Sequence, residues 1–412
     1  MKIPSARGFT LVELMVASLV GVIVVGGAVV LMINQQRAFA AGADDRALQE
    51  AGRLALEDIS NNLRMAGYGI DPAMAFDFGK MDNAPMDRAP GGTLVTITGQ
   101  SCATPVTCRD SATRPDELVF LARDAFFNHA VAAAPTTTEV KIQGPLNVPL
   151  HKGQILQLAC YTGTLDWAYV TVDAEVPVKT STGAISVAVG SHTGTDFPFQ
   201  NDWLLRPCFQ DGAVAALKVD RFRYFVGTYD AAGAVQTWGA AGARPFLMLD
   251  QGLVDASGTP ILTVAAPDVE DLQVSYLFPA ATAPALGSVP AVAGTPLANA
   301  AGGIELAPAA GIPSYGTART DPSRFTNHPA NIRGVRVAVV IRSAEKRTTL
   351  GSLQDNQLPA AGNRSALTAP ETGYRHLLFE ATTLTRNLDA RTPYIPVLST
   401  AAGTDNLNVG GG

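Results

Sequence analysis

The amino-acid sequence predicts an α+β protein in which one long N-terminal helix packs on a mainly antiparallel β-sheet domain. Three observations support this prediction. No charged residue occurs from Leu14 to Ile33, a helical pattern of apolar residues continues to Ala66, and short β-type runs separated by turn residues follow Asp71. A helix followed by a series of strands is typical of α+β folds rather than of alternating α/β folds.

The apolar run from Leu14 to Ile33 is long enough to cross a lipid bilayer. At about 1.5 Å per residue it gives roughly 30 Å of helix, the thickness of the hydrocarbon core. Lys2 and Arg7 precede the run, and Arg37 is the first charge after it. The positive-inside tendency therefore keeps the N-terminus in the cytoplasm and exports the rest. A secretory signal would have a shorter apolar core and a small-residue cleavage site, so we expect a permanent anchor.

One carboxylate, that of Glu13, stands at the start of the apolar run. An ordinary signal anchor has no use for it, because a carboxylate near hydrocarbon is costly and marks a function. The stretch Gly8-Phe9-Thr10-Leu11-Val12-Glu13 resembles the processing site of type IV prepilins and type II secretion pseudopilins. The resemblance implies that a membrane prepilin peptidase cuts between Gly8 and Phe9 and methylates the new N-terminus on Phe9. It also implies that Glu13 acts in assembly.

The helix is predicted to run from Phe9 to Ala66, roughly 87 Å, with Gly67 as its C-cap. Its exported part carries an apolar stripe at three- and four-residue steps, formed by Leu48, Gly52, Ala55, Ile59, Leu63 and Ala66. The helix exit Leu63–Gly69 resembles that of PilW-type minor pilins. Later segments are similar to strands of the same family, at Val269–Tyr276, Gly334–Ser343 and Thr383–Asn387.

Short β-type segments bounded by Pro, Gly, Asn or Thr follow the helix. The expected strands are Thr93–Thr98, Glu117–Ala122, Glu139–Ile142, Gln154–Cys160, Ala168–Val172, Ala184–Val189, Val219–Tyr229, Val235–Trp238, Val269–Phe278, Gly334–Arg342 and Tyr374–Thr385. An Ala/Pro-rich stretch at 279–313 is expected to be a surface insertion. The predicted organisation is a leader at 1–8, a membrane part at 9–33, an amphipathic helical part at 34–67 and a β-rich domain at 68–412.

Four cysteines in an exported chain favour disulfide bonds. Local pairing favours Cys102 with Cys108 and Cys160 with Cys208, although four cysteines allow three connectivities. The spacings match no zinc signature, so we expect no metal site.

No motif of an enzyme is found: there is no nucleotide-phosphate loop, no H-E-x-x-H and no G-x-S-x-G, so we expect neither catalysis nor a cofactor. The acidic trio Asp268, Glu270 and Asp271 offers calcium ligands, but its place before a predicted strand favours solvation at a strand edge. The sparse charge, with a net value of -6, predicts no nucleic-acid partner. The histidines are expected to lie on the surface: His129, His151, His192, His328 and His376. The tryptophans are expected to pack in the core or on the sheet: Trp167, Trp203 and Trp238.

The resemblance implies a minor pilin of the inner membrane, with one membrane pass, a cytoplasmic N-terminus and a periplasmic domain. Its implied partners are the prepilin peptidase, the inner-membrane assembly platform, and other minor and major pilins through packing of the N-terminal helices. It would end in the pilus or at the pilus tip. Two alternatives stay open: a J-type pseudopilin of a type II secretion system, and a periplasmic enzyme or binding protein on a pilin-type anchor.

Overall fold

The computed structural model describes residues 10–76, 111–191, 201–278, 332–346 and 357–389, except 112, 163–165, 256 and 363. It also describes four two-residue strands, β1 (Arg88–Ala89), β2 (Thr93–Leu94), β13 (Leu297–Ala298) and β14 (Ile304–Glu305). The leader, Phe9 and most of the predicted insertion lie outside the described residues. The chain divides into two compact units, residues 1–50 and 51–412, which are described separately.

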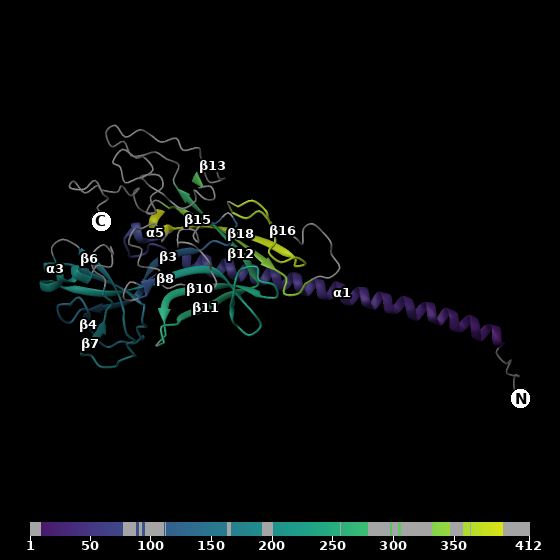
Figure 1. The fold of residues 1–412 in the computed structure, drawn as a ribbon, viewed down its shortest axis with the longest axis horizontal. Coiled ribbons are helices and arrows are strands. Elements are labelled where there is room, and N and C mark those ends of the chain that lie inside the picture. Colours follow the sequence, from purple (N-terminus) through teal and green to yellow (C-terminus); the bar gives the residue numbers. More distant parts are fainter. Residues whose placement is uncertain are drawn as a thin grey trace, which may run out of the picture. The chain divides into compact units, whose positions relative to one another are not determined.

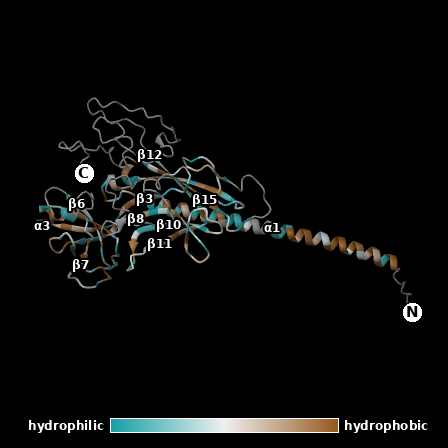
Figure 2. Ribbon diagram, in the orientation of Figure 1, coloured by the Kyte–Doolittle hydropathy of each residue, from teal (hydrophilic) through white to brown (hydrophobic). Residues whose placement is uncertain are grey.

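The helix α1 spans Leu11–Leu63 (Figure 1). Its first 26 residues, Leu11–Gln36, form a segment that is long and apolar enough to cross a membrane. The most apolar stretch of this segment has no buried residue. Figure 2 shows this part of α1 as predominantly hydrophobic. Fully exposed Leu, Val and Ile side chains are unfavourable in water, so their place is a lipid or protein environment.

The C-terminal end of α1 lies three residues before the predicted end at Ala66. After Leu63 the backbone tightens: the amides of Met65 and Ala66 donate to carbonyls three residues earlier rather than four. Gly67 then adopts φ +75°, which favours glycine. Its amide donates at 2.9 Å to the carbonyl of Leu121 in a strand instead of capping the helix. The helix therefore ends where the chain begins to pair with the sheet.

The larger sheet has seven antiparallel strands and is centred on the 16-residue strand β8. The strand order is β11-β10-β8-β5-β6, and β3 and β9 also pair with β8. The strands are β3 (Leu118–Ala130), β5 (Ile155–Cys160), β6 (Asp166–Thr171), β8 (Val214–Tyr229), β9 (Val235–Gln236), β10 (Arg244–Val254) and β11 (Pro260–Pro267). The hairpin β10–β11 was not among the expected strands.

The second sheet has five antiparallel strands in the order β13-β14-β12-β15-β18. Its main strands are β12 (Val269–Phe278), β15 (Gly334–Arg342) and β18 (His376–Leu384), and the first two coincide with the predicted bounds. Smaller elements complete the described fold: the pairs β4 (Glu139–Gln143) with β7 (Ala184–Ala188), β16 (Gln357–Leu358) with β17 (Leu367–Thr368) and β1 with β2, and the helices η1 (Pro72–Met74), η3 (Asn201–Leu205), α3 (Pro207–Asp211) and α5 (Arg386–Asp389).

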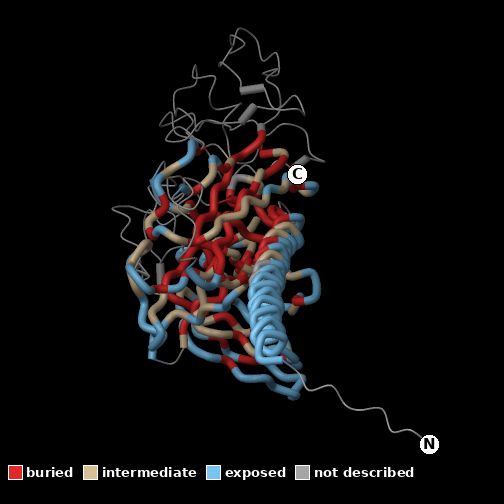
Figure 3. The backbone as a smooth tube through the Cα atoms, turned by 90° about the vertical axis from the view of Figure 1, so that its right-hand side faces the viewer, coloured by how far each residue is buried: buried red, intermediate tan, exposed pale blue. Residues whose placement is uncertain are grey.

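The part of α1 in the second unit packs on this β-structure through a stripe of small and branched residues. Ala55, Ile59 and Leu63 are fully buried, as the predicted stripe required. Polar contacts fix the same helix face: the hydroxyl of Tyr224 donates to Asp58 at 2.7 Å and accepts from the Asn62 amide. Figure 3 shows the buried backbone inside this unit. The predicted α+β class, a long helix with a mainly antiparallel β domain, is confirmed.

Side chains and backbone groups join the two sheets within the second unit. The amide of Asp116 donates at 2.7 Å to the carbonyl of Leu272 in β12, and its carboxylate accepts from the amide of Val274 at 2.9 Å. Arg244 on β10 binds both carboxylate oxygens of Asp268 at 2.7 Å. Asp116, two residues before β3, thus serves as a short extra partner for one edge of β12.

Candidate functional site

The candidate site lies at the first turn of α1, where Thr10 and Glu13 cap the helix reciprocally. The amide of Glu13 donates to Thr10 Oγ1 at 3.3 Å. In return, Glu13 Oε2 accepts from the Thr10 amide and the Thr10 hydroxyl, both at 2.9 Å. This is a capping box, which satisfies helix N-terminal amides that would otherwise lack a partner. The pattern Thr-x-x-Glu is visible in the sequence, but its local role was missed.

The capping box uses one carboxylate oxygen of Glu13. Within the described part of the chain, Thr10 is the hydrogen-bond partner found for this carboxylate, and it binds only Oε2. An ionised carboxylate has about four acceptor positions on its two oxygens. Glu13 can therefore cap its own helix and still accept a donor from outside the chain.

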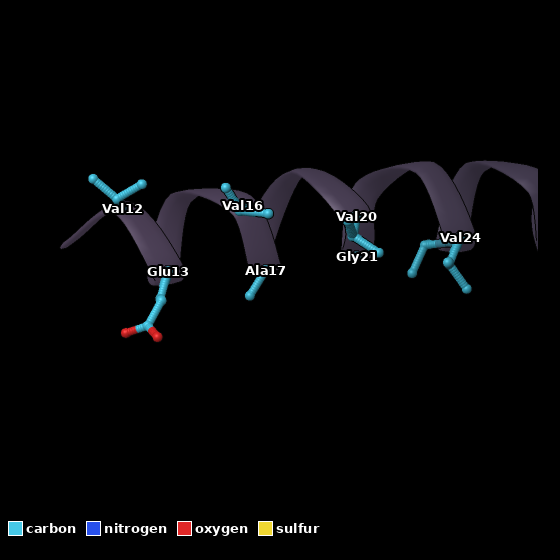
Figure 4. Close-up of a pocket in the computed structure, with 8 residues that line it drawn as sticks. Val12, Glu13, Val16, Ala17, Val20, Gly21 and Val24 are labelled. Atoms are coloured by element: carbon cyan, nitrogen blue, oxygen red, sulfur yellow. The ribbon is translucent and has the colours of Figure 1, made fainter. Parts of the chain in front are cut away.

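A shallow apolar groove runs along α1 from Glu13 (Figure 4). Ala17 and Gly21 follow Glu13 at four-residue steps, so the three lie on one helix face. Nothing lies within 4 Å of the position that a Cβ atom of Gly21 would occupy. The groove is completed by Val12, Val16, Val20, Val24 and Val25. Small residues on one face of a membrane helix let a second helix approach closely.

Cys160 and Cys208 form a disulfide bond, with their Cα atoms 6.0 Å apart. It links the end of β5 to the short helix α3. Beside it lies an apolar core that includes Phe209, Trp203 and Leu158. The other proposed pair, Cys102 and Cys108, lies outside the described residues, as do Gly8 and Phe9.

Replacing both Cys160 and Cys208 with serine should destabilise the domain. The bond closes a loop with a sequence separation of 48, and restricting the unfolded chain over such a loop contributes roughly 4 kcal/mol in the chain-entropy treatment. Urea unfolding of the full chain in detergent, followed by tryptophan fluorescence, measures the loss. Non-reducing mass spectrometry should find no free thiol in exported wild-type protein, and four alkylatable cysteines would contradict both proposed pairs.

The acidic trio does not solvate a strand edge, so that prediction is wrong. Asp268, Glu270 and Asp271 are all buried. Each meets a nitrogen-bearing side chain from another segment: Asp268 binds Arg244, Glu270 lies 2.6 Å from His376 Nε2, and Asp271 lies 2.7 Å from Arg364. Among the described residues, no group of three or more His, Cys, Asp or Glu side chains is placed to hold a metal ion. These carboxylates join the sheets and their covering segments.

The histidines and tryptophans considered as candidates lie partly on the surface and partly in packed regions. His129 and His151 lie on the surface, with His151 paired to Glu175 at 2.9 Å. His376 was expected on the surface, but its side chain is only 2% exposed, and its Nε2 lies 2.6 Å from the carboxylate of Glu270. His192 and His328 lie outside the described residues. The tryptophans pack against apolar clusters, Trp203 within one and Trp167 and Trp238 at the margins of two others.

One comparison with known families gives a match: residues 3–29 match the prokaryotic N-terminal methylation motif. This range contains Gly8, Phe9 and Glu13 and all the residues that line the apolar groove. No curated protein and no solved structure matches the chain. The motif indicates a type IV pilin-like or pseudopilin protein, membrane-anchored and pilus-associated, whose general partners are other pilins and the prepilin peptidase. The motif suggests a structural rather than an enzymatic protein.

Proposed function

We propose that this protein is a minor pilin that enters a type IV pilus by helix packing and takes part in initiating its assembly. The observation that carries the proposal is the first turn of α1, where Glu13 caps its own helix through one oxygen and heads an apolar groove that includes Ala17 and Gly21. In the described part of the globular domain, the buried acids Glu117, Asp271 and Glu270 are engaged in structural contacts with Arg223, Arg364 and His376.

Docking of a second subunit explains why a carboxylate is kept beside the hydrocarbon region. Cleavage after Gly8 creates an α-amino group on Phe9, and the matching amine of a neighbouring subunit is a cation at the same membrane depth. The second oxygen of Glu13 accepts this amine, while the Ala17 and Gly21 face receives the neighbouring helix. Helix packing alone tolerates several registers, so the charge pair fixes the axial position of the incoming subunit.

The proposed topology follows the charges around the anchor. The leader, residues 1–8, carries Lys2 and Arg7 and stays in the cytoplasm, and the β-rich domain lies in the periplasm. The prepilin peptidase and the inner-membrane assembly platform act on the protein before it enters the pilus. The PilW-like helix exit and strands favour the minor-pilin assignment. The methylation motif is shared with pseudopilins, so a J-type pseudopilin is the second candidate, and the genes beside this one distinguish the two.

Mature protein isolated from assembled material should begin at N-methyl-Phe9. Gly8 should be required, because a side chain at this position obstructs access of the peptidase to the scissile peptide bond. We expect Gly8→Val to remain uncleaved and outside pili, whereas Ala6→Val, a matched change within the leader, should be cleaved normally. Intact-mass and N-terminal peptide analysis measure both. An unprocessed Met1 start in assembled protein would contradict the proposal.

A further inference from the structure

Phe126 in strand β3 is the most exposed large hydrophobic side chain that the structure describes, at 99%. It lies in a large β-bulge. Arg123 pairs with Val219 of β8, but Asn128 pairs with Leu217, so residues 124–127 face the single residue Lys218. A bulge bends the strand and re-aims its side chains. Here it turns Phe126 away from the sheet, while the next residue, Phe127, points into the core.

The bulge is held in place from both sides. The carboxylate of Asp124 accepts from the Phe126 amide at 2.8 Å and binds the ammonium of Lys218 at 2.9 Å. Lys218 lies 3.4 Å from Asp220 as well. Partial burial opposes ionisation of Asp124, but the hydrogen bonds from Lys218 and the backbone outweigh it and lower the pKa of this carboxyl. The loop that presents Phe126 is therefore ordered by ionic and apolar contacts at once.

Single exposed apolar side chains are common and need no explanation. Phe126 differs because the structure supports its outward position with an ion pair, a backbone turn and a buried neighbour. Aromatic anchors that are ordered before binding lose little conformational entropy when a partner covers them, and such residues carry much of the binding energy at interfaces. A fixed, outward aromatic is what a docking anchor requires.

The position of the bulge indicates which kind of partner can reach Phe126. The amide of Arg123 donates at 2.9 Å to the carbonyl of Tyr68, and its guanidinium lies 5.3 Å from the centre of the Tyr68 ring. Tyr68 belongs to the turn that directly follows α1. Phe126 is three residues further along, which places its Cα atom at most about 10 Å from that of Arg123. A subunit whose helix packs beside α1 also leaves its own helix near this point, so its globular domain is the surface that comes within reach.

We propose that Phe126 anchors the globular domain of this protein to the globular domain of a neighbouring pilin-like subunit. The inference rests on the proposed function, because helix docking is what brings the second domain alongside. Subunits with parallel anchors meet through different surfaces, so the contact is heterologous and Phe126 enters an apolar pocket on the neighbour rather than meeting its own copy in the partner chain.

Site-specific photocrosslinking of the full chain in membranes tests the contact. Benzoylphenylalanine at position 126 should give an adduct with a chain that carries a prepilin-type N-terminus, identified by peptide mass spectrometry. The same group at Val264, a 54% exposed apolar residue of β11, is the matched control and should give about tenfold less adduct. An adduct only with lipid or with a protein of another class, or equal yields at both positions, would overturn the proposal.

A pair of substitutions adds a functional measurement. Phe126→Ser should reduce recovery in sheared pili or assembly complexes about tenfold, whereas Phe126→Tyr, which keeps the ring, should remain near wild type. Thermal unfolding of both should match the wild type because the side chain is exposed. Normal assembly of Phe126→Ser would count against the anchor. If Glu13→Ala still blocks assembly in that case, the proposed function stands while the domain contact fails, and the two ideas are thereby separated.

Discussion

Replacing Glu13 with alanine should abolish incorporation into pili or assembly complexes while leaving cleavage and membrane insertion intact. The proposed cleavage site, the peptide bond between Gly8 and Phe9, and the apolar run that drives insertion are both unchanged in this variant. In the proposed mechanism, the variant loses the carboxylate that accepts the α-amino group of a neighbouring Phe9. A missing partner leaves that buried cation unpaired, which costs several kcal/mol, so the loss of incorporation should be about a hundredfold or more.

Two further variants separate the charge of Glu13 from its capping role. Gln at this position of a capping box still accepts from the Thr10 amide, so Glu13→Gln keeps the helix start but removes the charge. Thr10→Ala does the reverse, removing the hydroxyl of the cap at a cost of about 1 kcal/mol while keeping the carboxylate. The pairing mechanism predicts that Glu13→Gln behaves like Glu13→Ala and that Thr10→Ala assembles.

Immunoblots of membrane and pilus fractions, with cleavage followed by the mass of the protein, measure these outcomes. The competing interpretation is that Glu13 only marks the membrane boundary. Wild-type incorporation of Glu13→Ala would support that interpretation and remove the residue from the mechanism. Incorporation of Glu13→Gln with failure of Glu13→Ala would show that helix capping, and not charge, is what assembly needs.

The anchor and its charged residue could be predicted from the sequence because their signals are local. An uncharged run and a Glu at its start need no knowledge of distant contacts. The same holds for β12 and β15, whose apolar pattern and flanking residues set both bounds. The end of α1 was misplaced by three residues, because the amide of Gly67 pairs with Leu121, a contact that no helix-capping pattern contains.

The hairpin of β10 and β11 was missed for a related reason. Residues Phe246–Leu249 form an apolar run without alternation, and Pro260 and Pro267 lie in β11. Prolines argue against a central strand but are tolerated at an edge, and β11 is the edge strand of its sheet. The pairing of β10 with β8 on one side and with β11 on the other shows that β10 is a strand.

The roles of Glu270, Asp271 and Phe126 depend on tertiary contacts and could not be read from the sequence. The side chains that contact the two acids come from residues about a hundred positions further along the chain, His376 and Arg364. The adjacent phenylalanines 126 and 127 look alike in the sequence. The bulge opposite Lys218, set by pairing with β8, decides which of the two faces solvent.

Replacing Arg364 with methionine should lower the free energy of unfolding by about 3–5 kcal/mol near neutral pH, as expected when a buried ion pair loses one partner. Arg364 Nη2 lies 2.7 Å from Asp271 Oδ2, and the side chains are 1% and 0% exposed. Burial raises the pKa of Asp271, and the charge of Arg364 and a hydrogen bond from Gln273 only partly oppose this effect. Without Arg364 the pKa should rise further, because the main opposing charge is gone.

The pH dependence and a double substitution make this prediction specific to the ion pair. A carboxyl whose folded-state pKa is raised stabilises the fold below its unfolded pKa, about 3.9, and this contribution is lost as the pH rises through the folded-state value. Arg364→Met should therefore be least destabilising in acid and most destabilising above neutrality. Removing both charges, as in Arg364→Met with Asp271→Leu, should recover most of the loss, since two apolar side chains replace a buried pair at little cost.

Urea unfolding of the full chain in detergent at several pH values, read by the fluorescence of Trp238 and the other tryptophans, measures each free energy. A single variant as stable as the wild type at neutral pH, or a double variant no better than the single, would show that the attraction between Arg364 and Asp271 does not hold β12 to the segment that carries Arg364.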